Sequence, residues 1–149
     1  MRDVLLVLHI VAVAAWLGAN IAQVVTTRRL VPDGGQTAAA WMETTVHWGR
    51  VLYTPAAIVI LATGIGLVLD SSLYDFSHAF VAVGFMVVII GAALAMTMFA
   101  KGGARAAAAF AAGDTTAGKA EVKKIMPWGI LDTLLLVIAV FAMVNKWGV

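Results

Sequence analysis

Four side chains that can bind a ligand or form hydrogen bonds lie along one face of the first hydrophobic segment. His9, Trp16, Asn20 and Gln23 lie at offsets of 0, 7, 11 and 14 residues. That spacing places them on a single stripe of an α-helix. A buried imidazole can bind a metal or carry a proton, while the amides and the indole N–H form hydrogen bonds. A helix that served only as an anchor would not need such a stripe, so we expect it to face the interior of a helical bundle.

A second histidine could join the first one at a cofactor. His9 lies early in its segment, and His78 begins a later segment that is expected to run in the same direction. Two neutral imidazoles can hold one haem, and the same nitrogens accept copper. His9 and His78 are therefore the candidate cofactor-binding residues, and His9 is the candidate metal ligand. The structural alternatives are a hydrogen bond between helices for His9 and a helix-start position for His78.

A second polar cluster is expected nearer the other end of the helices. Asp132 is the one charged residue within residues 128–145. An ionised group inside a membrane is costly unless it is paired or hydrated, so Asp132 should have a cationic partner. Arg50, Arg29 and Lys101 lie at compatible depth, and we choose Arg50. Asn20 and Gln23 are expected at the same depth as hydrogen-bonding members of this structural cluster. A role for Asp132 as a proton carrier is the alternative.

Hydrophobic segments long enough to cross a bilayer occur four times along the chain, since a membrane helix needs about 20 apolar residues. The expected spans are about 4–26, 51–69, 78–99 and 127–146. Consecutive membrane spans run in alternating directions. We therefore predict an all-α polytopic membrane protein, with residues 1–149 forming one bundle of four antiparallel transmembrane helices.

The connections also carry structural signals. Residues 37–50 have helical periodicity after a Pro-Asp-Gly-Gly turn, which predicts a cytoplasmic helical extension of the second span. Pro55 lacks an N–H and disfavours α geometry at the residue before it, so a bend is expected there. The Gly102-Gly103 pair is expected to interrupt the third helix, with a further short helix at 104–112.

Composition narrows the class of protein. Of the 149 residues, 62% are hydrophobic and 12% are charged, about half of the roughly 25% charged residues that are typical of soluble domains. The chain has no cysteine, which excludes disulfides, iron–sulfur clusters and thiolate metal sites. Its basic residues cluster in two loops beside hydrophobic segments, a pattern of membrane orientation that gives no support for nucleic-acid binding.

Lys and Arg positions predict the orientation in the membrane. Eight of the ten basic residues fall in the first and third connections, and only Arg2 and Lys146 lie on the other side. Because cytoplasmic loops carry the excess of Lys and Arg, both termini are expected outside. The bilayer is the expected surrounding, in the bacterial cytoplasmic (inner) membrane.

Three short motifs resemble a known group. The sequences L-H-I-V-A-V-A-A-W-L-G-A-N, Y-T-P-A-A-I-V-I-L-A-T-G and A-M-V-N-K are similar to segments of small bacterial four-helix proteins related to the copper resistance protein D domain and to HemJ-type protoporphyrinogen oxidases. A subfamily of integral membrane proteins without an assigned function is the closest resemblance in size. The resemblance implies the four-helix architecture and carries over His9 as a candidate functional residue.

Three functions from different classes follow from these observations. The resemblance and the stripe favour a haem-binding or redox-linked role that uses His9 as an axial ligand or proton-handling group. The alternative is a non-catalytic accessory subunit or homo-oligomer, whose glycine faces dock other membrane helices in a larger complex. Copper transport is the third, and the chain lacks the methionine-rich and cysteine features that would strengthen it. Whether the protein is an enzyme stays open.

Overall fold

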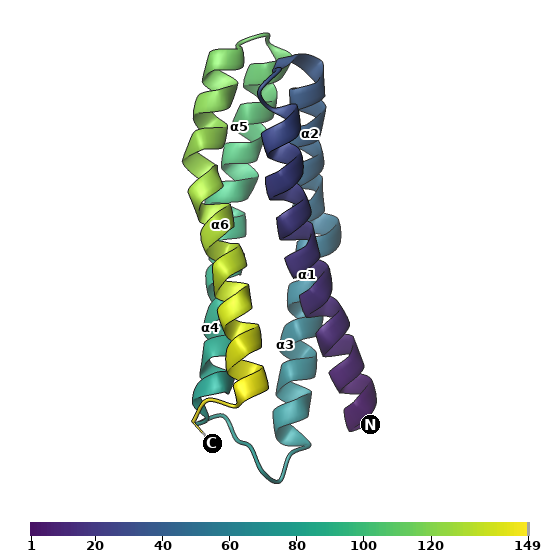
Figure 1. Ribbon diagram of the computed structural model, residues 1–149. Coiled ribbons are helices and arrows are strands. Elements are labelled where there is room, and N and C mark those ends of the chain that lie inside the picture. Colours follow the sequence, from purple (N-terminus) through teal and green to yellow (C-terminus); the bar gives the residue numbers. More distant parts are fainter. Residues whose placement is uncertain (149) are drawn as a thin grey trace.

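The computed structural model describes residues 1–148, which form an all-α bundle (Figure 1). α1 covers Arg2–Leu30 and α6 covers Thr115–Asn145. Between them, α2 (Gly35–Trp48) continues through the π-helical segment η1 (Gly49–Tyr53) into α3 (Thr54–Leu69). In the same way, α4 (Ala79–Leu94) continues through η2 (Ala95–Phe99) into α5 (Ala100–Ala111). The described chain contains no β-strand, and the predicted fold class is confirmed.

All four continuous helices are long and apolar enough to cross a membrane. They contain 29 to 35 residues, which at about 1.5 Å per residue corresponds to about 44–52 Å. The hydrocarbon core of a bilayer is only about 30 Å thick. Each helix is therefore longer than the hydrocarbon core requires. Large apolar side chains such as Ile58 and Ile89 lie on the outside, 62% and 63% exposed, as a lipid-facing surface requires.

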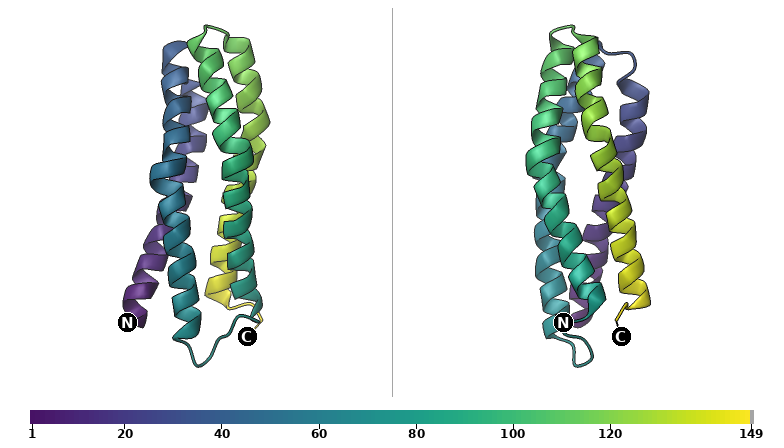
Figure 2. Two further views of the ribbon diagram at one scale, coloured as in Figure 1. Left: turned by 180° about the vertical axis from the view of Figure 1, so that it is seen from behind. Right: turned by 90° about the vertical axis from the view of Figure 1, so that its left-hand side faces the viewer.

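The helices alternate in direction, and both chain ends lie at one end of the bundle (Figures 1 and 2). We call this the termini end; it also holds the connection at residues 70–78. The opposite turn end holds the short turns around Gly34 and Gly113, whose φ angles of 67° and 80° favour glycine. At the second turn the Asp114 carboxylate accepts a hydrogen bond from the Ala117 N–H at 2.9 Å and caps the N-terminus of α6.

Pro55 does not bend the chain sharply. The helix instead widens to π geometry just before the proline, over Gly49–Tyr53, and the Thr54 hydroxyl donates to the Gly49 carbonyl at 2.8 Å. A π turn accommodates an extra residue and recurs at functional sites. η2 is the corresponding widening in the next long helix.

The prediction that Gly102-Gly103 interrupts the third helix is wrong. The helix continues to Ala111 because both glycines serve as close-packing positions inside the bundle. A Cβ on Gly102 would lie 2.5 Å from Ile125, and one on Gly103 would lie 2.8 Å from Val46. The expected short helix at 104–112 is therefore the end of this long one.

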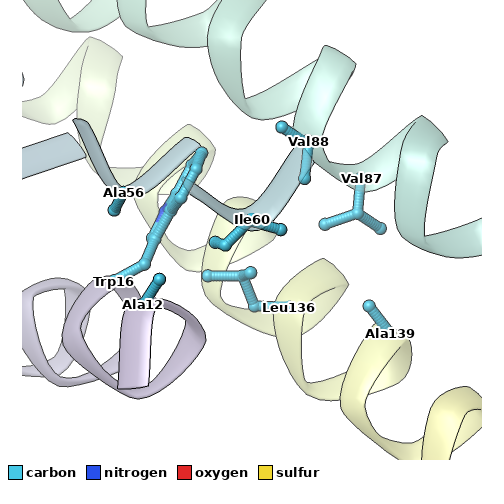
Figure 3. Packing of buried hydrophobic residues seen from close by; sticks show 8 residues of the cluster. All are labelled: Ala12, Trp16, Ala56, Ile60, Val87, Val88, Leu136 and Ala139. Atoms are coloured by element: carbon cyan, nitrogen blue, oxygen red, sulfur yellow. The ribbon is translucent and has the colours of Figure 1, made fainter. Parts of the chain in front are cut away.

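The hydrophobic core has two parts. At the turn end, small side chains bring α2 and α5 together, including Ala38 and Ala106, which are fully buried, around Phe110. The middle and termini half is held by a second cluster, which Figure 3 shows with side chains from α1, α3, α4 and α6. Trp16 is its largest member and is 4% exposed. This ring lies between the two polar sites described next.

Candidate functional site

His9 is buried at 8% exposure and is held in one orientation by a neighbouring helix. Its Nδ1 lies 2.9 Å from the Thr63 hydroxyl oxygen on α3. Gly64, the next residue, faces the ring, and a Cβ there would lie 3.4 Å from His9 Cε1, an ordinary van der Waals contact. The predicted stripe of α1 thus contacts α3 at Thr63 and Gly64.

The hydrogen bonds around Thr63 determine the tautomer of His9. The Thr63 hydroxyl has one proton, and the 2.6 Å distance from its oxygen to the Val59 carbonyl shows where it is donated. The same oxygen must then accept from His9, so Nδ1 carries the hydrogen and Nε2 keeps a lone pair. No partner among residues 1–148 occupies Nε2. A ring fixed through one nitrogen with the other nitrogen unprotonated is the arrangement that metal-ligating histidines adopt.

His9 lines a cavity of about 220 Å³ at the termini end, which we call the His9 cavity. Most of its wall is apolar, from α1, α3, α4 and α6. Two further basic residues, Arg2 and Lys146, line it, and no acidic residue does among residues 1–148. Tyr74 also lines it, with Lys146 Nζ 5.1 Å from the centroid of its ring. The cavity therefore combines an imidazole, apolar walls and positive charge.

His78 lies outside the described lining of the His9 cavity. Its Nδ1 bonds within the connection between α3 and α4, accepting from the Asp75 N–H at 3.0 Å and lying 3.1 Å from Asp75 Oδ1. The hydroxyl and the backbone N–H of Ser77 both donate to that carboxylate. Both bonds lower the pKa of Asp75, and the bond from the hydroxyl has the larger effect. His78 precedes the first residue of α4, the position given above as its structural alternative.

Asp132 forms the second polar cluster, 3% exposed in the middle of the bundle. Its Oδ2 accepts from Asn20 Nδ2 at 2.7 Å and from Trp16 Nε1 at 3.0 Å, both on α1. The structure thus brings Asn20 to Asp132, together with Trp16 of the same stripe. Asp132 Oδ1 and the Tyr53 hydroxyl are buried without a hydrogen-bond partner among residues 1–148.

The structure does not bring Arg50 to Asp132. The Arg50 side chain is exposed, and the ion pairs of residues 1–148 do not include it. Arg50 lies in the π-helical segment η1, where the turn differs from that of an α-helix. Its side chain therefore points in a direction that α-helical spacing does not predict. Gln23 is half-buried and faces a cavity, without a hydrogen bond to Asp132.

Beside Asp132 lies a larger cavity of about 320 Å³, which we call the Asp132 cavity. It extends from Trp16 and Asp132 toward the turn end and is bounded by both π-helical segments, through Tyr53 of η1 and Phe99 of η2. Gly91 lies against the carboxylate at the Trp16 end of this cavity, since a Cβ on it would lie 2.9 Å from Asp132 Oδ1. Two separate cavities thus lie along one bundle, on either side of the Trp16 layer.

The glycines of α4 face inward. Gly84 and Gly91 are both buried, and a Cβ on Gly84 would lie 2.5 Å from Met143 Cε. Their role in this structure is close packing within the bundle, so they leave no glycine face on α4 free for docking another helix.

Three site residues escaped the sequence analysis. Arg2 was counted only as a charge for orientation, Lys146 as a charge and as part of a motif, and Tyr53 only as part of a motif. Their positions at the ends of a long bundle and inside a π segment bring them to the cavities, and hydrophobic periodicity carries no signal for that.

Residues 1–148 contain no group of three or more His, Cys, Asp or Glu side chains placed to hold a metal ion. Among the histidines of residues 1–148, His9 is the one that lines either of the two cavities described above. No family model, curated protein or solved structure matches the chain.

Proposed function

We propose that this chain is a small multi-pass protein of the bacterial inner membrane with a haem-binding or redox-linked role centred on His9. One observation carries the proposal. The His9 ring is buried, Thr63 fixes its Nδ1–H, and the lone pair of Nε2 belongs to a side chain that lines a cavity. An axial haem ligand needs these properties, and so does a proton-handling imidazole.

The charges of the His9 cavity support an anionic ligand. Arg2 and Lys146 line it together with His9, and the rest of its lining is mainly apolar and aromatic. Haem has an apolar macrocycle with carboxylate side chains, which basic residues can pair with. The motif resemblance to proteins related to the copper resistance protein D domain and to HemJ-type proteins carries over His9, which lines this cavity.

Size is the demanding part of the fit. The cavity volume of about 220 Å³ is below the roughly 300–1,000 Å³ that is usual for small-molecule sites. A macrocycle would require the walls to open. Met143, whose flexible thioether reaches over Gly84, is the side chain best suited to make that room. When bound, haem would supply an iron that changes oxidation state, while His9 would supply the ligand nitrogen and Arg2 and Lys146 the charge.

The test is a haem titration of the purified protein in mild detergent, followed by absorption in the Soret region. The wild type should give a saturable Soret band. His9→Ala should weaken haem binding by at least about tenfold, since it removes the ligand nitrogen. His78→Ala is the matched control, because His78 lies outside the described lining of the cavity. An absent band in the wild type, or equal binding by the His9→Ala protein, contradicts the proposal.

The two alternatives have less support. The accessory-subunit interpretation relied on glycine faces for docking, and Gly84 and Gly91 face the interior. Gly18 on α1 is exposed with nothing within 4 Å of an added Cβ, so a homo-oligomer or larger complex would dock on a face other than that of α4. Copper transport would rely on His9 without a described cluster of further ligands.

The membrane orientation that we propose places both termini outside. It can be tested cleanly because the chain has no cysteine. Ser72→Cys marks the termini end and Asp33→Cys marks the turn end, and both positions are exposed. In intact cells an impermeant thiol reagent should label the cysteine at position 72 only; the reverse pattern would overturn the orientation.

A further inference from the structure

The Asp132 cavity has no part in the proposed role of His9, and its chemistry differs from that of the His9 cavity. Its lining includes the Asp132 carboxylate and no Lys, Arg or His among residues 1–148. The His9 cavity has the opposite composition, with Arg2 and Lys146 and no acidic residue in the same part of the chain. The two cavities are therefore suited to ligands of opposite charge.

The carboxylate itself is incompletely satisfied. Oδ2 accepts two hydrogen bonds from neutral donors, Trp16 and Asn20. Oδ1 accepts none from residues 1–148, although it is as deeply buried. A buried carboxylate is costly unless a positive charge and hydrogen-bond donors compensate it. The described ion pairs do not involve Asp132, so the protein's own side chains leave that role open.

The surrounding side chains suit an amphipathic cation. Trp16 and Tyr53 pack edge to face with ring centroids 5.7 Å apart, and both rings line the cavity together with Phe99. Aromatic faces attract an organic cation. The Tyr53 hydroxyl is a second buried group without a partner in the described residues. Toward the turn end the wall is mainly apolar, with Val46, Ile125 and Met126, and it includes the hydroxyls of Thr27 and Thr45.

We propose that the Asp132 cavity binds a lipophilic amine in its ammonium form, with the charged nitrogen at the Asp132 carboxylate and the apolar body directed toward the turn end. The volume of about 320 Å³ lies within the roughly 300–1,000 Å³ that is usual for small-molecule sites. Both π segments contribute side chains to its walls, and π turns recur at functional sites.

The test compares two probes of the same shape and different charge, octylammonium and 1-octanol, by isothermal titration calorimetry on the purified protein in detergent. Octylammonium should bind the wild type at least about tenfold more tightly than octanol, because it adds a charge-assisted hydrogen bond. Asp132→Asn keeps the side-chain volume and removes the charge, so it should abolish this preference.

A second pair of variants leaves the carboxylate intact. Ala95 lines the cavity on η2, whereas Ala93, two residues earlier, is exposed on the outside. Ala95→Leu should weaken octylammonium binding by at least about tenfold, while Ala93→Leu adds the same volume without effect. Equal binding of the two probes, an unchanged preference in Asp132→Asn, or equal effects of the two leucines would overturn the proposal. An infrared spectrum that shows a protonated Asp132 in the presence of octylammonium would also overturn the proposal, since the site would then hold a proton and no ammonium ion.

Discussion

Replacing Gly91 by alanine should destabilise the bundle, because this residue lies where three helices meet. An added Cβ would be 2.8 Å from Trp16 Cζ2 and 2.9 Å from Asp132 Oδ1. Both distances are shorter than those that folded proteins tolerate. The indole is held by its own hydrogen bond to Asp132, so it cannot move away without losing that bond.

The size of the effect follows from three contributions. Overpacking a filled core costs about 1–3 kcal/mol. Displacing the indole weakens a hydrogen bond to a charged group, which is worth about 1.5–3 kcal/mol. Exchanging glycine for alanine in a helix returns about 0.5–1 kcal/mol. The net loss in the free energy of unfolding should therefore be about 1.5–5.5 kcal/mol.

The assay is reversible unfolding in mixed detergent micelles, followed by tryptophan fluorescence. Gly18→Ala on α1 is the matched control, because nothing lies within 4 Å of the Cβ that it adds. That substitution should leave stability unchanged or raise it by up to about 1 kcal/mol. Gly84→Ala should fall between the two, since the atom it meets is the flexible end of Met143. If Gly91→Ala and Gly18→Ala had the same effect, the packing argument around Asp132 would be refuted.

Three further predictions use other contacts. Trp16→Phe keeps the aromatic packing but removes the indole N–H that donates to the buried carboxylate, and should cost about 1.5–3 kcal/mol in the same unfolding assay. Thr63→Val removes the hydrogen-bond partner of His9 Nδ1 and should weaken haem binding by about 10–100-fold in the Soret titration; an unchanged affinity would contradict the role of that bond. Asp75 has a pKa lowered by the hydrogen bonds from Ser77, so its contribution to stability is complete above the ordinary value of about 3.9 and is lost as the pH falls through the lowered value. Asp75→Asn should accordingly flatten the acid side of the stability curve measured by thermal unfolding, and an unchanged curve would count against these bonds.

The fold could be predicted from the sequence because hydrophobic length and periodicity specify membrane helices directly. The positions of His9, Trp16 and Asn20 on one interior face of α1 followed from their spacing, and all three are buried. The helix ends were harder to predict. Gly102 and Gly103 have the local sequence of a helix breaker, but in three dimensions they are positions of close packing between helices.

The partners of Asp132 show where the reasoning from sequence stops. Depth arguments placed it correctly beside Asn20, but they chose Arg50 on the ground that a buried charge needs an opposite one. Arg50 lies in a π segment whose position no helical offset reveals, and the carboxylate instead accepts from neutral donors. Residue spacing gives faces and depths, whereas side-chain pairing depends on the rotation of each helix in the bundle.

The central claim, that Thr63 holds His9 as the neutral Nδ1–H tautomer with a lone pair on Nε2, is tested most directly by nitrogen-15 NMR of a histidine-labelled protein at neutral pH. His9→Ala assigns the signal, and the account predicts a protonated Nδ1 and an unprotonated Nε2 before any ligand is added. An Nε2–H tautomer or an imidazolium at His9 would contradict it.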